Sequence, residues 1–222
     1  MKIRKSEERG SHSESWLEAK HSFSFAGYQD SQWVNFGSLR VLNEDRIAPG
    51  SGFPMHAHND MEIITIMLSG EIRHRDSMGN EGSIYSGEVQ AMTAGTGIRH
   101  SEWNPSKETT HLFQMWLFPD KDGLTPQYDQ FKPEDNKIQV LASNHGEGLH
   151  INTNAEILRL KLEAGDSYTT AKDKKVYIHI VKGSLTAQKE NLNAGDAVAL
   201  DQEETTVTAS NQAEIIVVKM KS

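Results

Sequence analysis

The stretch from Gly50 to Glu62 is Gly-Ser-Gly-Phe-Pro-Met-His-Ala-His-Asn-Asp-Met-Glu, and it contains two histidines two residues apart. Side chains on a β-strand alternate between its two faces, so residues two apart point the same way. On a strand, His56 and His58 therefore present two imidazoles to one point, as a divalent transition metal requires. The stretch predicts β-structure built around a metal site.

A second pair with the same spacing follows downstream, His100-Ser101-Glu102. The two pairs supply three nitrogens and one oxygen, which leaves one or two coordination positions for water, substrate or O2, as in catalytic sites. Coincidentally spaced surface or core histidines are the alternative, and two pairs in one half of the chain argue against it. The helical His-Glu-x-x-His pattern of zinc proteases is absent. We therefore expect one metal ion held by His56, His58, His100 and Glu102.

The rest of the chain is typical of an all-β protein. Its 17 glycines punctuate short β-prone runs, and no stretch carries a long apolar stripe at helical spacing. The glycine-containing segment 76–82 is expected to be a hairpin turn. The clearest strands of the first half are expected at residues 34–48, 61–69, 71–76, 88–93 and 111–118.

The chain is expected to divide into two halves. Residues 119–137 contain three prolines, several charges and few aliphatic residues, and are expected to connect the halves. This gives a first, metal-binding domain over 1–125 and a second, metal-free domain over 138–222.

A weak internal repeat supports this division. Residues 68–72 and 85–89 match residues 181–185 and 193–197 in the same order, with a glycine ending one strand and a Gly-acidic turn opening a later one. Chance similarity of glycine turns is the alternative, but two correspondences in order favour duplication.

Composition excludes several classes of function. The formal net charge of -8 disfavours nucleic acids and anionic membranes as partners. The chain has no cysteine, which rules out disulfides, thiolate metal sites and a cysteine nucleophile. The charged N-terminus lacks the apolar stretch of a signal peptide, and no window approaches a membrane span. We expect a cytoplasmic protein, and a monomer.

At these residues the sequence resembles a known family. Residues 50–62 resemble the first motif of the cupin superfamily, and residues 87–104 resemble the second. The segment 92–102, Met-Thr-Ala-Gly-Thr-Gly-Ile-Arg-His-Ser-Glu, is similar to the pirin family, and specifically to bacterial pirin-like proteins with quercetin 2,3-dioxygenase activity. Further segments that fit this group are Trp16-Leu17, 21–25, 38–43, 76–80 and 114–116.

The resemblance implies a bicupin, two packed double-stranded β-helix (jelly-roll) barrels, the second of them degenerate. In many cupins the first-motif glutamate, here Glu62, is a metal ligand. The pirin pattern instead implies Glu102. Glu62 has the same strand parity as His56 and His58, so the residues alone leave this choice open.

The resemblance also implies an activity, the oxygenative cleavage of flavonols such as quercetin with loss of carbon monoxide. The flavonol would bind an open metal position through its 3-hydroxyl oxygen, and Glu102 would be both ligand and catalytic base. Three nitrogens and one oxygen suit Fe(II), the metal that the resemblance favours, although Zn, Mn, Co, Ni or Cu could also occupy the site. The alternative is an iron-binding, redox-sensitive regulatory or binding protein of the pirin type without turnover.

Other residues near the motifs carry weaker expectations. His74 and His111 are expected to be structural rather than partners of the metal ligands, and His179 has no companion with which to form a site. Gln114 is equally consistent with facing the pocket and with lying at a strand edge. Phe53 and Met55 are expected in core packing, with an aromatic-substrate slot as the alternative.

Overall fold

The computed structural model describes residues 1–222 and is almost entirely β-structure, with one short 3-10 helix, η1 (Ser6–Glu8). None of its helices is long and apolar enough to cross a membrane. The chain forms two compact units. The N-terminal barrel comprises Gly10–Pro133 and Leu149–Thr153, and the C-terminal barrel comprises Met1–Arg9, Glu134–Gly148 and Asn154–Ser222. The predicted all-β architecture of two domains is confirmed.

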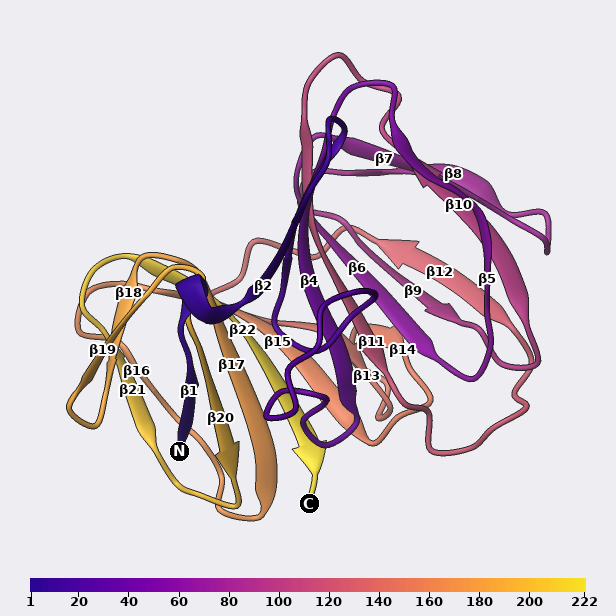
Figure 1. Cartoon of the computed structure of the whole chain (residues 1–222). Helices are drawn as coiled ribbons and strands as arrows, with labels where there is room; N and C mark the ends of the chain where they lie inside the picture. Colours follow the sequence, from indigo (N-terminus) through magenta and orange to yellow (C-terminus); the bar gives the residue numbers. More distant parts are fainter. The chain divides into compact units, whose positions relative to one another are not determined.

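The N-terminal barrel consists of two antiparallel sheets (Figure 1). The larger has the order β12-β9-β6-β11-β4-β3-β2, and the smaller has the order β5-β10-β7-β8. The strands of this barrel are β2 (Gly10–Ser13), β3 (Leu17–His21), β4 (Leu39–Ile47), β5 (Gly52–His58), β6 (Glu62–Ser69), β7 (Glu71–Asp76), β8 (Glu81–Tyr85), β9 (Val89–Thr93), β10 (Ile98–Trp103), β11 (Thr110–Leu117), β12 (Gln127–Phe131) and β14 (Leu149–His150).

Apolar side chains from both sheets meet between them. Ile72 and Ile84 of the smaller sheet pack in one cluster with Ile47, Met67 and Leu112 of the larger. Burying this apolar surface contributes roughly 25 cal/mol per Å² and holds the two sheets face to face. The smaller sheet, which carries the predicted metal ligands, is thereby fixed over the larger one.

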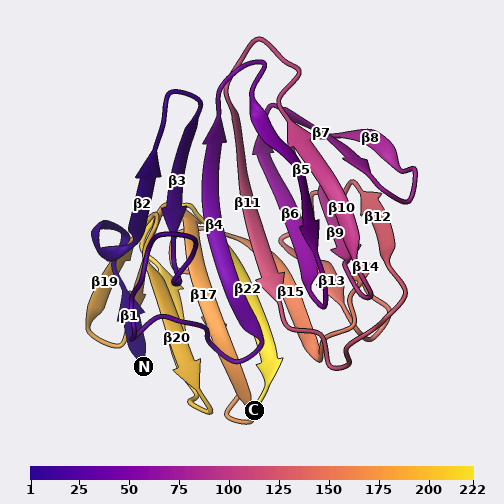
Figure 2. The same cartoon turned by 45° about the vertical axis from the view of Figure 1, so that its right-hand side comes forward.

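The C-terminal barrel repeats this plan. Its larger sheet includes the order β1-β20-β17-β22-β15-β13 (Figure 2). Its smaller sheet has the order β16-β21-β18-β19. One aliphatic cluster fills the space between them. The strands of this barrel are β1 (Lys2–Arg4), β13 (Ile138–Ser143), β15 (Ala155–Leu162), β16 (Ser167–Thr169), β17 (Lys174–Lys182), β18 (Ser184–Ala187), β19 (Glu190–Asn193), β20 (Ala197–Asp201), β21 (Thr206–Ala209) and β22 (Ala213–Lys221).

The internal repeat predicted from the glycines is confirmed in the strand ladders. The register between β11 and β6 skips Leu68, and that between β22 and β17 skips Val181. Two residues later, Gly70 and Gly183 both have φ of 80°, a conformation that favours glycine. A Cβ on either would also lie within 3 Å of the neighbouring strand. The matched bulges and glycines align the two barrels residue by residue.

Two segments form strands whose partners could not be predicted from their local sequence. Residues 1–9, placed in the first domain by the sequence analysis, belong to the C-terminal barrel because β1 pairs with β20 from Lys2↔Ala199 to Arg4↔Ala197. Within the expected connection 119–137, β12 pairs with β9 as an edge strand. An edge strand is paired on one side only and tolerates the polar composition that suggested a linker.

Candidate metal centre and adjoining cavity

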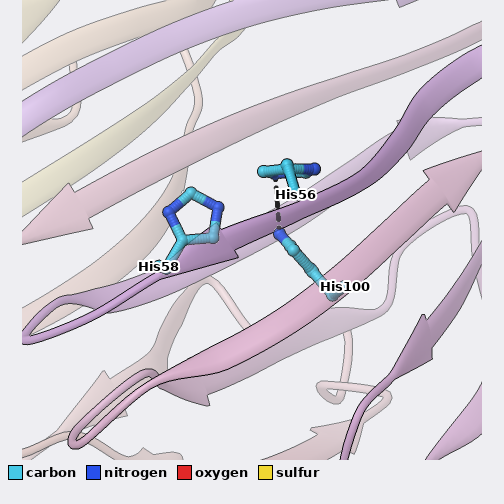
Figure 3. Close-up of side chains that lie close together, drawn as sticks. All are labelled: His56, His58 and His100. Atoms are coloured by element: carbon cyan, nitrogen blue, oxygen red, sulfur yellow. Dashed lines mark hydrogen bonds between the residues drawn. The ribbon is translucent and has the colours of Figure 1, made fainter.

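The two histidine-bearing segments lie on adjacent strands of the smaller sheet. β5 carries His56 and His58 two residues apart, and β10 pairs with it so that His100 lies directly opposite His56. The ring centroids of these three histidines are 4.4 to 4.9 Å apart. Figure 3 shows the three rings converging, with a contact between His56 and His100. The predicted convergence on one point is confirmed.

The hydrogen bonds of His56 fix which nitrogen faces the cluster. Its Nδ1–H donates to the Pro54 carbonyl oxygen at 2.8 Å, which leaves the Nε2 lone pair directed at the cluster. The Nε2 atoms of His56 and His100 are 3.0 Å apart. Two nitrogen ligands about 2.1 Å from one ion, at a right angle, would be separated by about the same distance. The spacing therefore fits a shared metal.

Two further atoms at the cluster are buried without a hydrogen-bond partner, His58 Nε2 and Glu102 Oε1. Unpaired buried polar atoms are costly, because they give up hydration without replacing it. Both atoms offer lone pairs with which to bind a cation. Potential ligand atoms within 4.8 Å of one another form two groups, His56, His58 and His100 in one and His74, His100 and Glu102 in the other, so His100 is common to both. Nitrogen and carboxylate oxygen are also ligands suited to divalent transition metals.

Two histidines of the cluster, His58 and His100, are held in the neutral form. Burial, followed by the proximity of His100 and His56, lowers the pKa of His58 to about 4. Burial, followed by His56 and His74, lowers the pKa of His100 to about 3. Neutral imidazole is the form that binds metals, so these two ligands need lose no proton near pH 7.

Glu102 is held by residues of the opposite sheet. Gln114 on β11 donates its Nε2–H to Glu102 Oε2 at 3.0 Å, and Trp116 donates its indole N–H to Gln114 Oε1, also at 3.0 Å. This chain of hydrogen bonds fixes one carboxylate oxygen and leaves the other, Oε1, as the buried unpaired atom. Gln114 faces the pocket, which resolves the two alternatives left by the sequence.

Glu62, the ligand position of ordinary cupins, is bonded elsewhere. It lies on β6 of the larger sheet and accepts hydrogen bonds from Thr93 at 3.0 Å and Asn152 at 3.5 Å. Burial raises its pKa, although these hydrogen bonds oppose the shift. No group of potential metal ligands within 4.8 Å of one another includes Glu62.

His74 lies closer to the centre than the sequence indicated. It is fully buried on β7, and its ring centroid is 5.3 Å from that of His100. Ligand atoms of His74, His100 and Glu102 lie within 4.8 Å of one another. His74 Nε2–H donates to Asp76 at 3.1 Å, and this bond, after that from Asn80, helps to lower the pKa of Asp76 although burial opposes the shift. His111 instead pairs with Glu44 and does not line the cavity at the metal centre.

A cavity of about 750 Å³ opens beside the cluster. This volume lies within the usual range for small-molecule sites. Phe53 lines it, whereas Met55 is exposed and does not. Its other walls come largely from the N-terminal segment, which the sequence indicated only through the family resemblance. The residues lining the cavity are Ser11, His12, Trp16, Leu17, Ala19, His21, Phe25, Ala26, Gly27, Tyr28, Asn43, Asp45, Phe53, Pro54, His56, His58, Glu102, Gln114 and Trp116.

Comparison with family models matches both barrels. Residues 2–117 match the model described as Pirin, and residues 140–220 match the model of the quercetinase C-terminal cupin domain.

Full-length relatives agree with the family models. The chain is 39% identical over 221 residues to quercetin 2,3-dioxygenase of Escherichia coli K12, covering 96% of each chain. It is 42% identical over 214 residues to a pirin-like protein of Caulobacter vibrioides, covering 91% of this chain and 92% of that protein.

A solved structure shares the whole fold. The crystal structure of bacterial pirin YhhW from Escherichia coli in complex with nickel(II) superposes with a TM-score of 0.94 at 37% identity. The match covers 99% of this chain and 98% of that one.

Proposed function

The chain belongs to the pirin family, and from this premise we propose that it is a metal-dependent dioxygenase that cleaves flavonols such as quercetin. One observation carries the proposal most: the imidazoles of His56, His58 and His100 converge beside a cavity of about 750 Å³ lined by aromatic side chains. The Glu102 carboxylate lies within 4.8 Å of a ligand atom of His100. The full-length relatives named quercetin 2,3-dioxygenase support the same substrate class.

The proposed ligands are His56, His58, His100 and Glu102. The support is the 3.0 Å separation of the Nε2 atoms of His56 and His100, together with the unpaired buried atoms of His58 and Glu102. The proposed metal is Fe(II), since three nitrogens and one oxygen suit it, although the same ligands accept Ni(II) and other divalent ions.

The chain's own residues then have distinct roles. When bound, the metal supplies a Lewis acid and a template for the flavonol 3-hydroxyl oxygen and O2. Glu102 accepts the proton of that hydroxyl, while Gln114 keeps the carboxylate aligned. Phe53 and Trp116 form apolar walls for a flat ring system. Overall, one flavonol and one O2 give a ring-opened ester and one carbon monoxide.

The proposal is tested by stripping the protein of metal and reloading it anaerobically with one divalent metal at a time. Oxygen uptake and carbon monoxide release are then measured with quercetin, and with luteolin as a control that lacks the 3-hydroxyl group. We expect at least one metal to support uptake with quercetin, with about one carbon monoxide released per O2, and no uptake with luteolin.

The same experiment separates the enzyme from its alternative. If no metal supports quercetin-dependent uptake although the protein binds metal, the dioxygenase proposal is wrong. The iron-binding regulatory protein would then be the better account.

A further inference from the structure

A row of polar side chains crosses the floor of the cavity. The floor is the inner face of the larger sheet, where Asn43 on β4 pairs with Gln114 on β11 and with His21 on β3. All three side chains line the cavity, and Asn43 and His21 are only 3% and 5% exposed. The row therefore consists of two buried polar side chains and the half-buried Gln114, all of which border an open space.

The row begins at the candidate metal centre and leads away from it. Gln114 is bonded to Glu102, and Asn43 and His21 follow on the next two strands. Neighbouring strands are about 4.8 Å apart, so the row extends about 10 Å across the sheet. His21 Nδ1–H donates to Asn43 Oδ1 at 2.9 Å, which leaves the Nδ2–H donors of Asn43 for a ligand.

The C-terminal barrel shows that the fold does not need polar residues here. With the two ladders aligned on Gly70 and Gly183, the positions of Gln114, Asn43 and His21 correspond to Val217, Leu158 and Val140. Leu158 and Val217 belong to the aliphatic core of that barrel, and the partly buried Val140 packs against it. Since burying polar groups costs free energy that aliphatic packing avoids, the polar row points to a ligand.

Aromatic rings lie beside the far end of the row. The centroids of Phe25 and Tyr28 are 5.2 and 6.4 Å from that of His21, and the Tyr28 ring is stacked, at an interplanar angle of 28°. Phe25 also meets Trp116 edge to face at 5.3 Å. A flat aromatic ring that reached this end would find apolar walls and polar donors together.

We propose that Asn43 and His21 form a second polar subsite that binds hydroxyl groups on the substrate ring remote from the metal. The chain would thus select flavonols that are hydroxylated at both ends. This inference rests on the proposed function for the identity of the ligand.

The test compares two flavonols that differ only in the remote ring, quercetin with two hydroxyls there and galangin with none. Each is titrated anaerobically into metal-loaded protein, and binding is followed by quenching of tryptophan fluorescence, because Trp16 and Trp116 line the cavity. We expect quercetin to bind about tenfold more tightly, the size of one net hydrogen bond. Equal affinities, or no binding of either flavonol, would overturn the proposal without any variant.

Variants then assign the preference to the row. Asn43→Leu places the residue of the C-terminal barrel at this position, and His21→Phe removes the imidazole. Each should reduce the preference to within about twofold while leaving metal content and galangin affinity unchanged. Glu44→Gln is the control, since Glu44 neighbours Asn43 on β4 but pairs with His111 and does not line the cavity. A preference that persists in both variants contradicts the subsite.

The outcome separates the subsite from the activity. A preference for quercetin that depends on Asn43, without oxygen uptake, would sustain the subsite and refute the dioxygenase. Quercetin-dependent uptake without the preference would do the reverse.

Discussion

The two barrels share one strand plan and differ in what fills it. In the smaller sheets, His74 pairs with Glu102 on β7 and β10, and the corresponding pair on β18 and β21 is Ala187 and Val207. Ala187 and Val207 are fully buried in the aliphatic core. A catalytic type of interior and a structural one thus occupy the same framework through side-chain changes at a few inward positions.

Strand length makes the second difference. Phe53 on β5 and Tyr168 on β16 are equivalent, since they pair with the equivalent residues Glu102 and Val207. β5 continues five residues beyond Phe53 to His58, whereas β16 ends one residue beyond Tyr168, at Thr169. The extension carries both histidines of the His-x-His pair, so the C-terminal barrel lacks the backbone that would present them.

The largest expected effect is the loss of metal from a His56→Ala/His58→Ala variant. Both residues lie on the extension that distinguishes β5 from β16, and only two of the four ligands would remain. We expect metal content to fall from about one ion per chain to below about 0.1, measured by elemental analysis after gel filtration. Retention of a full equivalent would show that the extension is not the site.

Exchanging interior residues should destabilise the two barrels by unequal amounts. Leu158→Asn buries an amide in the aliphatic core and should lower the free energy of unfolding by about 2–5 kcal/mol. The equivalent exchange in the N-terminal barrel, Asn43→Leu, should cost less, about 1 kcal/mol, because the gain from removing a buried amide offsets part of the loss of the His21 hydrogen bond. Urea denaturation measures the free energy of unfolding of both variants. Similar losses in the two would contradict the proposed difference between the interiors of the barrels.

Substitution of the two buried glutamates should affect the metal affinity of the protein to different extents. Glu102→Gln removes the carboxylate at the cluster, and we expect metal affinity to fall by about a hundredfold or more. Glu62→Gln is the matched control, because it makes the same change at a carboxylate bonded to Thr93 and Asn152. Competition with a chromophoric chelator measures both. A larger loss in Glu62→Gln than in Glu102→Gln would mean that Glu62 binds the metal, as the equivalent glutamate does in many cupins.

Gln114 provides a finer test, because its equivalent in the C-terminal barrel is Val217. Gln114→Val removes the hydrogen bond that aligns Glu102 without removing a ligand. We expect metal affinity to fall by about tenfold and stability to change little. A loss as large as that of Glu102→Gln would mean that Gln114 acts on more than the orientation of the carboxylate.

A pH dependence of stability is also expected in the N-terminal barrel. The pKa values of His58 and His100 are lowered to about 4 and about 3, below the ordinary value of 6.5. Between these values the unfolded chain binds more protons, so stability falls as the pH drops from about 6.5 toward 4, by at most about 1.4 kcal/mol per pH unit for each histidine.

Hydrogen exchange of metal-stripped protein resolves this effect by strand. Protection of β5 and β10 should fall with pH over this range, and His58→Phe should flatten the dependence. An unchanged slope in the variant would remove His58 as its source.

The clustering of the histidines could be predicted from the sequence because its pattern is local. Two His or Glu side chains two residues apart converge whenever their segment is a strand, and His56, His58 and His100 do so. Strands β6, β7, β9 and β11 begin and end within one residue of the predicted ranges, while β4 begins five residues later than expected. Alternating apolar residues bounded by glycine turns sufficed for this level of detail.

The choice between Glu62 and Glu102 could not be made by strand parity. Parity holds only along one strand, and the chain turns at Asp60, where φ is 46°, before β6 begins in the other sheet. The resemblance to the pirin family, and not strand geometry, favoured Glu102 as the ligand.

Contacts between segments that are far apart along the chain could not be predicted from the sequence either. Residues 2–4 pair with residues 197–199, and no local pattern specifies that partner. The cavity walls contributed by residues 11–28 depend in the same way on where β2 and β3 join the sheet. The polar row of His21, Asn43 and Gln114 likewise depends on the pairing of β3, β4 and β11, which no local pattern specifies.

The central claim, one metal held by the N-terminal barrel alone, is tested most directly by anomalous scattering from crystals of metal-loaded protein at the metal's absorption edge. The account predicts a single peak per chain, about 2.0–2.2 Å from nitrogens of His56, His58 and His100 and from Glu102 Oε1. A peak bound by Glu62, or a second ordered ion bound by residues 138–222, would contradict it.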